Sequence, residues 1–294
     1  MKPGFIDRRV SLKTLGWTSA LILGTGSGGL LAASFLQSGG YLELDTRSEY
    51  SHIRILRRNN VRTLIFVRDS GEEAYESQVD LDRPYELHFA YLRDMFASYF
   101  FRPKPERVLI VGLGGGSMVH FLRRYDPGVR VDAIEIDPVV VDIAKKYFGV
   151  RADDKVKILT GDGIKYLQTT ESRYDVIYMD AFLKPSGQTD NTGAPLRLRT
   201  LDFYRDVQKR LNPKGLVVIN LNPHPDIDED LRTIRAAFRH VYVFHLPNLQ
   251  GKVVVGSIAP EREEWATLRR RAPELDRRFG MRSFFQSIFR HLER

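Results

Sequence analysis

Polar and glycine-rich positions follow four apolar runs in the middle of the chain, at the points where each run would end as a strand. The loop 112–117, GLGGGS, follows the first run, and Glu135, Asp162 and Asp180 follow the next three. Ligands of open α/β sheets bind outside the carboxyl ends of the parallel strands, so we expect these groups to meet at one edge of a sheet. The sequence therefore predicts a site for a nucleoside-like ligand.

The glycines of this loop are Gly112, Gly114 and Gly116. They allow bare backbone to approach a ligand at the N-terminus of the helix that follows. The dinucleotide fingerprint G-x-G-x-x-G would need a glycine at position 117, where Ser117 stands, so the loop argues against NAD.

The carboxylates make the prediction more specific. Glu135 lies 19 residues beyond Gly116, where a carboxylate can accept hydrogen bonds from both ribose hydroxyls. Asp162, followed by Gly163, can accept a hydrogen bond from an exocyclic adenine amine. Each acid alone is also explained as a helix cap or a solvated turn. Their shared position at strand ends favours a nucleoside site over four unrelated caps.

The chain from 105 to 260 alternates strand and helix patterns, which is typical of an α/β protein with a parallel sheet. Two final β-rich runs, 241–246 and 252–258, are separated by a link too short for a parallel crossover and must be antiparallel neighbours. We therefore predict a Rossmann-like sheet closed by a β-hairpin, as in class I S-adenosylmethionine-dependent methyltransferases. The predicted strands are 107–111, 129–134, 156–159, 174–179 and 216–221.

Two further segments flank this nucleotide-binding domain. Residues 41–104 predict a small β-rich domain with a hairpin over 51–57 and 62–68, a third segment at 76–81 and a linking helix over 85–101. Residues 261–294 predict a basic helical extension that packs on the domain, with a membrane-surface or nucleic-acid role as the alternative.

Residues 1–40 have the plan of a targeting segment. Arg8-Arg9 and Lys13 precede an uncharged stretch over 15–36, and this order resembles a twin-arginine export signal. We expect export to the periplasm or anchoring in a membrane. The alternative is a cytoplasmic protein with a glycine-rich N-terminal helix.

The composition excludes several classes of protein. Hydrophobic residues make up 43% and charged residues 28%, which excludes a disordered chain and one with many membrane spans. The absence of cysteine excludes disulfides, thiolate metal sites and a cysteine nucleophile, and we expect no metal. The net charge is +8, but no basic run is long, so we expect no nucleic-acid partner.

Several motifs resemble those of the spermidine synthase family of aminopropyltransferases, over about residues 41–258. They are VLIVGLGGGS, AIEIDP, GDG, YDVIYMDAF, PLRLRTLDFY and the Tyr-x-x-Ile stretch that begins at Tyr50. The resemblance implies binding of decarboxylated S-adenosylmethionine and transfer of its aminopropyl group to a small amine. It also implies that Glu135 holds the ribose, Asp162 holds the adenine and Asp180 is the catalytic base.

The sequence departs from that family at two positions. Ser117 and Leu183 stand where the family has aspartates that bind amino groups, which places activity on putrescine in doubt. Two alternatives therefore stay open: a methyltransferase that uses ordinary S-adenosylmethionine, and a non-catalytic protein that binds nucleosides or polyamines. We also allow for a homodimer and for contact with a membrane through the N-terminal segment.

Overall fold

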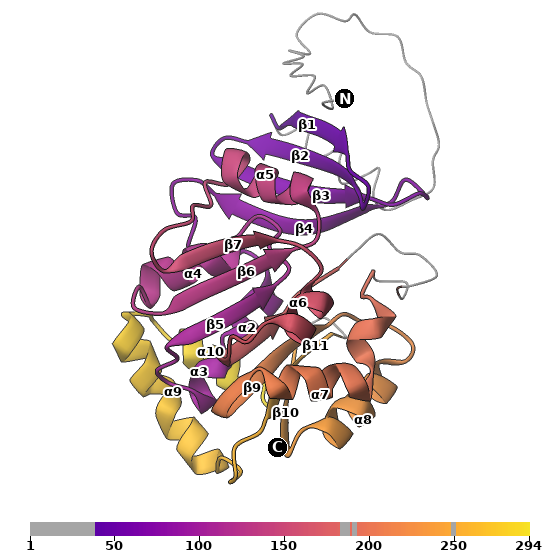
Figure 1. The fold of residues 1–294 in the computed structure, drawn as a ribbon. Helices are drawn as coiled ribbons and strands as arrows, with labels where there is room; N and C mark the ends of the chain where they lie inside the picture. The colour runs from indigo at the N-terminus through magenta and orange to yellow at the C-terminus, as the bar shows by residue number, and fades with distance from the viewer. Residues whose placement is uncertain (1–38, 183–188, 190–192, 248–250) are drawn as a thin grey trace, which may run out of the picture.

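The computed structural model describes residues 39–182, 189, 193–247 and 251–294, so the leader lies almost entirely outside the described residues. Within them the chain forms an antiparallel sheet followed by a larger mixed sheet (Figure 1). The smaller sheet stands at the top of Figure 1, and helices cover both faces of the larger sheet below it.

The smaller sheet has four strands in chain order, each antiparallel to the next. They are β1 Tyr41–Arg47, β2 His52–Arg58, β3 Val61–Val67 and β4 Glu73–Asp80. The predicted hairpin is confirmed as β2 and β3. Asn59, in the turn between them, has a φ of 53°, a left-handed conformation that asparagine tolerates. The third predicted segment is β4, and β1 is an additional strand.

The larger sheet has seven strands in the order β10-β11-β9-β8-β5-β6-β7. Strands β5 to β9 are parallel, and β11 runs antiparallel to both β9 and β10. This confirms the predicted Rossmann-like sheet and its closing hairpin. The strands are β5 Arg107–Val111, β6 Arg130–Glu135, β7 Val156–Thr160, β8 Tyr174–Met179, β9 Leu211–Leu221, β10 His240–His245 and β11 Lys252–Ser257.

Helices that connect the parallel strands divide between the two faces of this sheet. One core contains apolar residues of α4 Ser117–Tyr125, and the other contains those of α6 Gly163–Thr169, α7 Leu201–Lys209 and α8 Ile227–Ala237. A 3-10 helix, η1 Leu196–Arg199, precedes α7. The crossovers thus return every parallel strand in the same direction and bring the carboxyl ends of β5 to β8 to one edge.

One helix, α5 Pro138–Tyr147, belongs to both layers. Val141 and Ala144 pack into the core of the larger sheet, whereas Val140 and Ile143 pack against the four-stranded sheet. Figure 1 shows α5 lying across β2 and β3. The smaller sheet is therefore held against the edge of the larger one where the candidate site lies.

The predicted single helix over 85–101 is wrong. Two short helices, α2 Ala90–Met95 and α3 Ser98–Phe101, occupy this region. Arg93 Nε donates to the Leu87 carbonyl at 3.1 Å, and the backbone of Phe89 is extended, so the helix begins only at Ala90. The break between the two helices turns three aromatic side chains into the core: Phe96, Tyr99 and Phe100.

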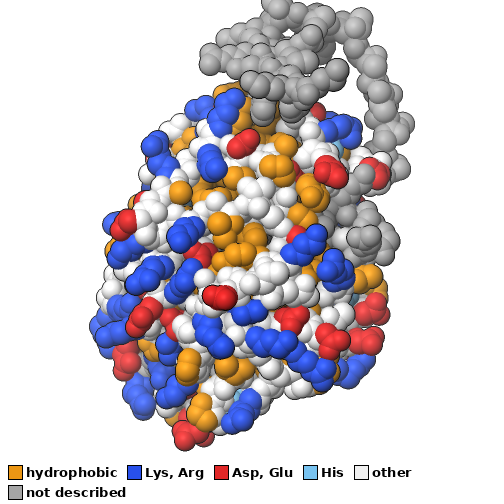
Figure 2. All heavy atoms as spheres, viewed as in Figure 1, with side chains coloured by type: hydrophobic (Ala, Val, Ile, Leu, Met, Phe, Trp, Pro, Cys, Tyr) orange, Lys and Arg blue, Asp and Glu red, His pale blue; other side chains and the backbone are white. Residues whose placement is uncertain are grey.

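The C-terminal extension forms α9 Trp265–Phe279 and α10 Phe284–Arg290. Both helices pack on the larger sheet as predicted, through Leu268, Leu275 and Phe285 among others. Figure 2 shows basic and acidic side chains interspersed over the visible face. Among the described residues, no helix combines the length and the apolar character needed to cross a membrane.

Candidate active site

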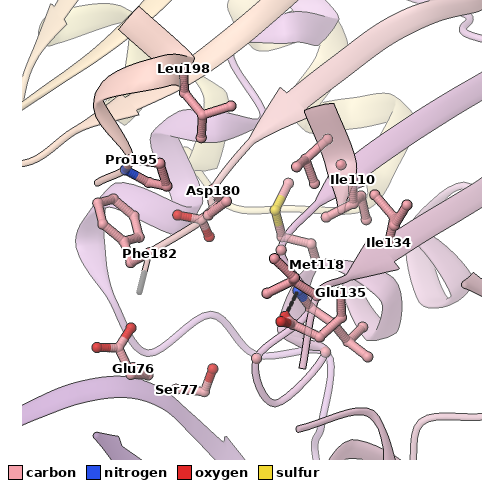
Figure 3. A pocket seen from close by; sticks show the side chains of 18 of the residues that line it. Glu76, Ser77, Ile110, Met118, Ile134, Glu135, Asp180, Phe182, Pro195 and Leu198 are labelled. Atoms are coloured by element: carbon pink, nitrogen blue, oxygen red, sulfur yellow. Dashed lines mark hydrogen bonds between the residues drawn. The ribbon is translucent and has the colours of Figure 1, made fainter. Parts of the chain in front are cut away.

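A cavity of about 330 Å³ lies between the carboxyl ends of β5 to β8 and strand β4 (Figure 3). The site residues expected from the sequence all line it: Gly112, Gly114, Gly116, Glu135, Asp162, Gly163 and Asp180. The sheet topology explains this meeting, because parallel neighbours end at the same edge.

The glycine loop has backbone conformations and close contacts that a side chain would disturb. Gly112, Gly114 and Gly116 have φ values of 96°, 52° and 74°, in the left-handed region. A Cβ on Gly112 would collide with the Asp180 carbonyl, and one on Gly163 would lie 2.6 Å from a methyl group of Val111. The glycines therefore allow the loop and α6 to lie directly against the strand ends.

Glu135 ends β6 and is held by backbone amides. Its Oε2 accepts a hydrogen bond from the Leu113 amide at 2.9 Å, and its Oε1 accepts one from the Asp137 amide at 3.1 Å. Burial raises the pKa of Glu135, and these hydrogen bonds act against the increase. A carboxylate has about four lone-pair sites, so two amides leave acceptor capacity for a pair of ribose hydroxyls.

Asp162 serves as the N-cap of α6 as well as lining the cavity. Its Oδ1 accepts a hydrogen bond from the Ile164 amide at 2.8 Å. The other carboxylate oxygen makes no hydrogen bond with any residue that the structure describes. The helix cap and the adenine contact are thus compatible functions of the two oxygens.

Asp180 follows β8 and is fixed by side chains from two other elements. Its Oδ1 accepts a hydrogen bond from Asn220 Nδ2 at 2.9 Å, and its Oδ2 accepts one from the Tyr91 hydroxyl at 3.3 Å. Burial raises the pKa of Asp180 to about 6, although both hydrogen bonds favour the charged form. At neutral pH the group is mostly ionised and remains more basic than an ordinary aspartate, as a proton acceptor requires.

Sequence reasoning missed both hydrogen-bond partners of Asp180. Asn220 lies near the end of β9, so the same strand-end argument could have found it. Tyr91 lies within the segment predicted as a linking helix, and only the three-dimensional fold shows its hydroxyl at the cavity.

Sequence reasoning also missed Glu76 and Ser77, which β4 brings to the cavity (Figure 3). In the pairing of β3 with β4, Leu64 lies opposite Ser77 and Ile65 lies opposite Tyr75, so Glu76 is the extra residue of a β-bulge. The Gly115 amide donates to Ser77 Oγ at 2.9 Å and joins β4 to the glycine loop. The sequence has no clear signal for the register of these strands.

The two departures from the family pattern have different outcomes. Ser117 begins α4 and lines the cavity, and its buried hydroxyl has no hydrogen-bond partner among the described residues. Leu183 lies outside the described residues. The surface acids Glu86 and Asp202 pair with Arg83 and Arg205 and do not line the cavity, so neither replaces the missing aspartates there.

No group of three or more His, Asp or Glu side chains in the described part of the chain is placed to hold a metal ion. The expectation of chemistry without a metal stays a prediction.

The fold and the cavity together define a class I S-adenosylmethionine-dependent methyltransferase-like protein with a small N-terminal sheet. The family model of the spermine/spermidine synthase domain matches residues 89–264, more than half of the chain. The chain belongs to this family.

Known proteins of two kinds resemble this chain. The polyamine aminopropyltransferase of Vibrio vulnificus is 30% identical over 235 residues, which cover 79% of this chain and 76% of that protein. The structure of human methyltransferase-like protein 13 in complex with SAH is similar with a TM-score of 0.60 and 25% identity, over 66% of this chain and 94% of that one. Spermidine synthase from Thermotoga maritima shares the fold, with a TM-score of 0.62 and 20% identity over 84% of each chain.

Proposed function

We propose that this protein is a transferase that moves the aminopropyl group of decarboxylated S-adenosylmethionine to a small amine. The observation that carries the proposal is Asp180, a hydrogen-bonded carboxylate with a pKa raised to about 6, in the same cavity as Glu135 and Asp162. The named activity of the Vibrio relative supports the same reaction.

A base is needed because the acceptor is protonated in solution. An alkylamine has a pKa of about 10.4, so the free amine at neutral pH costs about 4 to 5 kcal/mol. The Asp180 carboxylate binds the ammonium ion, accepts one proton from it and orients the freed lone pair. Asn220 and Tyr91 hold the carboxylate in place for this transfer.

The reaction is an in-line displacement. The amine lone pair forms a bond to the aminopropyl carbon attached to sulfur, while the carbon–sulfur bond breaks and its electron pair stays on sulfur. The sulfonium thus becomes the neutral thioether of methylthioadenosine, and the proton held by Asp180 passes to solvent. In this arrangement Glu135 binds the ribose and Asp162 binds the adenine of the donor.

The direct test is an assay of the full-length protein with decarboxylated S-adenosylmethionine and putrescine or other small amines. We expect methylthioadenosine and the alkylated amine in equal amounts, detected by mass spectrometry. A parallel reaction with ordinary S-adenosylmethionine tests methyl transfer. Methylated product with S-adenosylmethionine, and none with the decarboxylated donor, would contradict the proposal.

We also propose that residues 1–40 direct the chain to the periplasm or anchor it in a membrane, on the basis of Arg8-Arg9 and the uncharged stretch that follows. A reporter fused to residues 1–40 should leave the cytosol. Replacing both arginines by lysine should keep it there. A reporter that stays in the cytosol with the parent segment would argue for the cytoplasmic alternative.

A further inference from the structure

Glu76 is an acidic side chain of the cavity wall. It makes no hydrogen bond or ion pair with any residue that the structure describes, although it is partly buried and lines the cavity wall. Its neighbour on the same strand, Glu73, is different because it pairs with Arg54 at 3.0 Å. A partly buried carboxylate without a partner is costly, so the position of Glu76 favours a ligand that supplies the missing cation.

The charges around Glu76 indicate what that ligand is. Asp180 and Glu135 both interact electrostatically with Glu76 across the cavity, and Arg68 is the cation that acts on it. Burial, followed by Asp180, raises the pKa of Glu76 to about 8. In Figure 3 Glu76 lies across the open space from Asp180. Three acidic side chains around one cavity favour a ligand with more than one positive charge, because such a ligand stabilises the ionised form of Glu76.

The location of Glu76 indicates which part of the ligand it meets. Ser77, the next residue, accepts the hydrogen bond from the Gly115 amide, so this part of β4 lies against the glycine loop. Glu135, which we place at the ribose, and Asp180, which we place at the reacting amine, both interact electrostatically with Glu76. The chain that leaves the donor sulfur starts between those two positions. Ser117, at the end of the loop, lines the cavity, but its hydroxyl is uncharged and buried.

We infer that Glu76 binds the ammonium group of the donor's aminopropyl chain and thereby selects the decarboxylated donor over ordinary S-adenosylmethionine. The decarboxylated donor carries a sulfonium and an ammonium and no negative charge, which complements the cavity. Ordinary S-adenosylmethionine adds a carboxylate beside the same ammonium, and this carboxylate is repelled by the ionised form of Glu76 that the ammonium stabilises. The inference rests on the proposed function and assigns its donor specificity to one side chain of the smaller sheet.

The test is calorimetry of the full-length protein with three ligands: decarboxylated S-adenosylmethionine, S-adenosylmethionine and methylthioadenosine. Glu76→Gln should weaken the binding of the decarboxylated donor roughly ten- to a hundredfold. The same variant should bind S-adenosylmethionine as well as the parent or better, and methylthioadenosine, which has no charged chain, equally well. Effects of opposite direction on two ligands distinguish recognition from a general loss of structure.

Matched variants control this experiment. Glu73→Gln makes the same change on the same strand, at a side chain that does not line the cavity, and should leave all three affinities unchanged. Glu76→Asp keeps the charge on a shorter side chain and should retain part of the preference for the decarboxylated donor. This variant also provides the test if Glu76→Gln does not fold.

Two results would overturn the inference: an equal loss for all three ligands, or an unchanged affinity for the decarboxylated donor. A Glu76→Gln variant that weakens only a diamine acceptor would likewise overturn it and would assign Glu76 to the acceptor. Turnover separates this inference from the proposed function. A parent protein that transfers nothing but prefers the decarboxylated donor through Glu76 would contradict the function and support the inference.

Discussion

The two sheets contribute to one cavity in different ways. The larger sheet supplies carboxylates that its own framework already holds, with Glu135 on two backbone amides and Asp180 on Asn220. The smaller sheet supplies Glu76 from a bulge, without a hydrogen bond to any described residue, and Ser77 as its connection to the loop. The difference indicates that the larger sheet provides a preorganised nucleoside and proton-transfer site. The smaller sheet provides Glu76, whose pKa burial raises to about 8, so a cationic ligand is what favours its charged form at neutral pH.

The largest expected effect concerns Asp180, the proposed base on the larger sheet. Asp180→Asn keeps the shape and the acceptor oxygen but cannot take a proton, so kcat should fall by roughly a hundred- to ten-thousandfold. Affinity for methylthioadenosine should change little, because Glu135 and Asp162 supply the nucleoside contacts. Single-turnover kinetics together with calorimetry measure the two effects separately. Full activity of the variant on any acceptor would remove Asp180 from the mechanism.

The next effect concerns the nucleoside contacts. Glu135→Ala and Asp162→Ala should each weaken the binding of methylthioadenosine roughly ten- to a hundredfold, because each removes charged hydrogen bonds. Asp162→Ala should also destabilise the fold by about 0.5 to 2 kcal/mol through loss of the α6 cap. Asp162→Asn, which keeps a capping oxygen and an acceptor, should have smaller effects on both. Unchanged affinity in both alanine variants would show that the nucleoside lies elsewhere.

The contrast between the sheets also explains which parts of the site the sequence predicts. Glu135, Asp162 and Asp180 directly follow or end apolar runs, and the βα alternation fixes where such positions meet. The position of Glu76 at the cavity depends on a register shift between β3 and β4. The alternation of apolar and polar residues in these strands does not show where this bulge lies. Tyr91 depends on where α2 begins, and the hydrogen bond from Arg93 to the Leu87 carbonyl just before that point has no signal in the apolar spacing. The sequence therefore predicts the topology of the sheet, but it does not predict the register of the strands or the ends of the helices.

The stability of the ligand-free protein should depend on pH through the proton that Glu76 holds. Burial raises the pKa of Glu76 from about 4.5 to about 8, so between these values the folded protein holds a proton that the unfolded chain has lost. The free energy of unfolding should therefore fall as pH rises towards 8. The groups that face Glu76 are Asp180, Glu135, Arg68 and Tyr91. Of these, Asp180 titrates near pH 6 and contributes mainly below pH 7.

Thermal unfolding of the ligand-free protein between pH 7 and 9 measures this effect, with Glu76→Gln as the comparison. The parent should lose stability up to about pH 8 and little above it, and the variant should lose less because it has no proton to release there. Equal slopes for the two proteins would mean that Glu76 is already ionised at pH 7 and holds no proton in the ligand-free protein.

The smallest expected effect concerns Ser77, the contact between the two sheets. Ser77→Ala leaves the buried Gly115 amide without its acceptor, which should destabilise the protein by about 1 to 3 kcal/mol. Ser70→Ala removes a hydroxyl from an exposed position near the start of β4 and should have almost no effect. Because Ser77 positions β4 on the glycine loop, Ser77→Ala should weaken the binding of the decarboxylated donor a few-fold and leave the binding of methylthioadenosine unchanged. Equal weakening of both ligands would instead show that Ser77 supports the loop itself, so that the smaller sheet stabilises the nucleoside site as well as supplying charge.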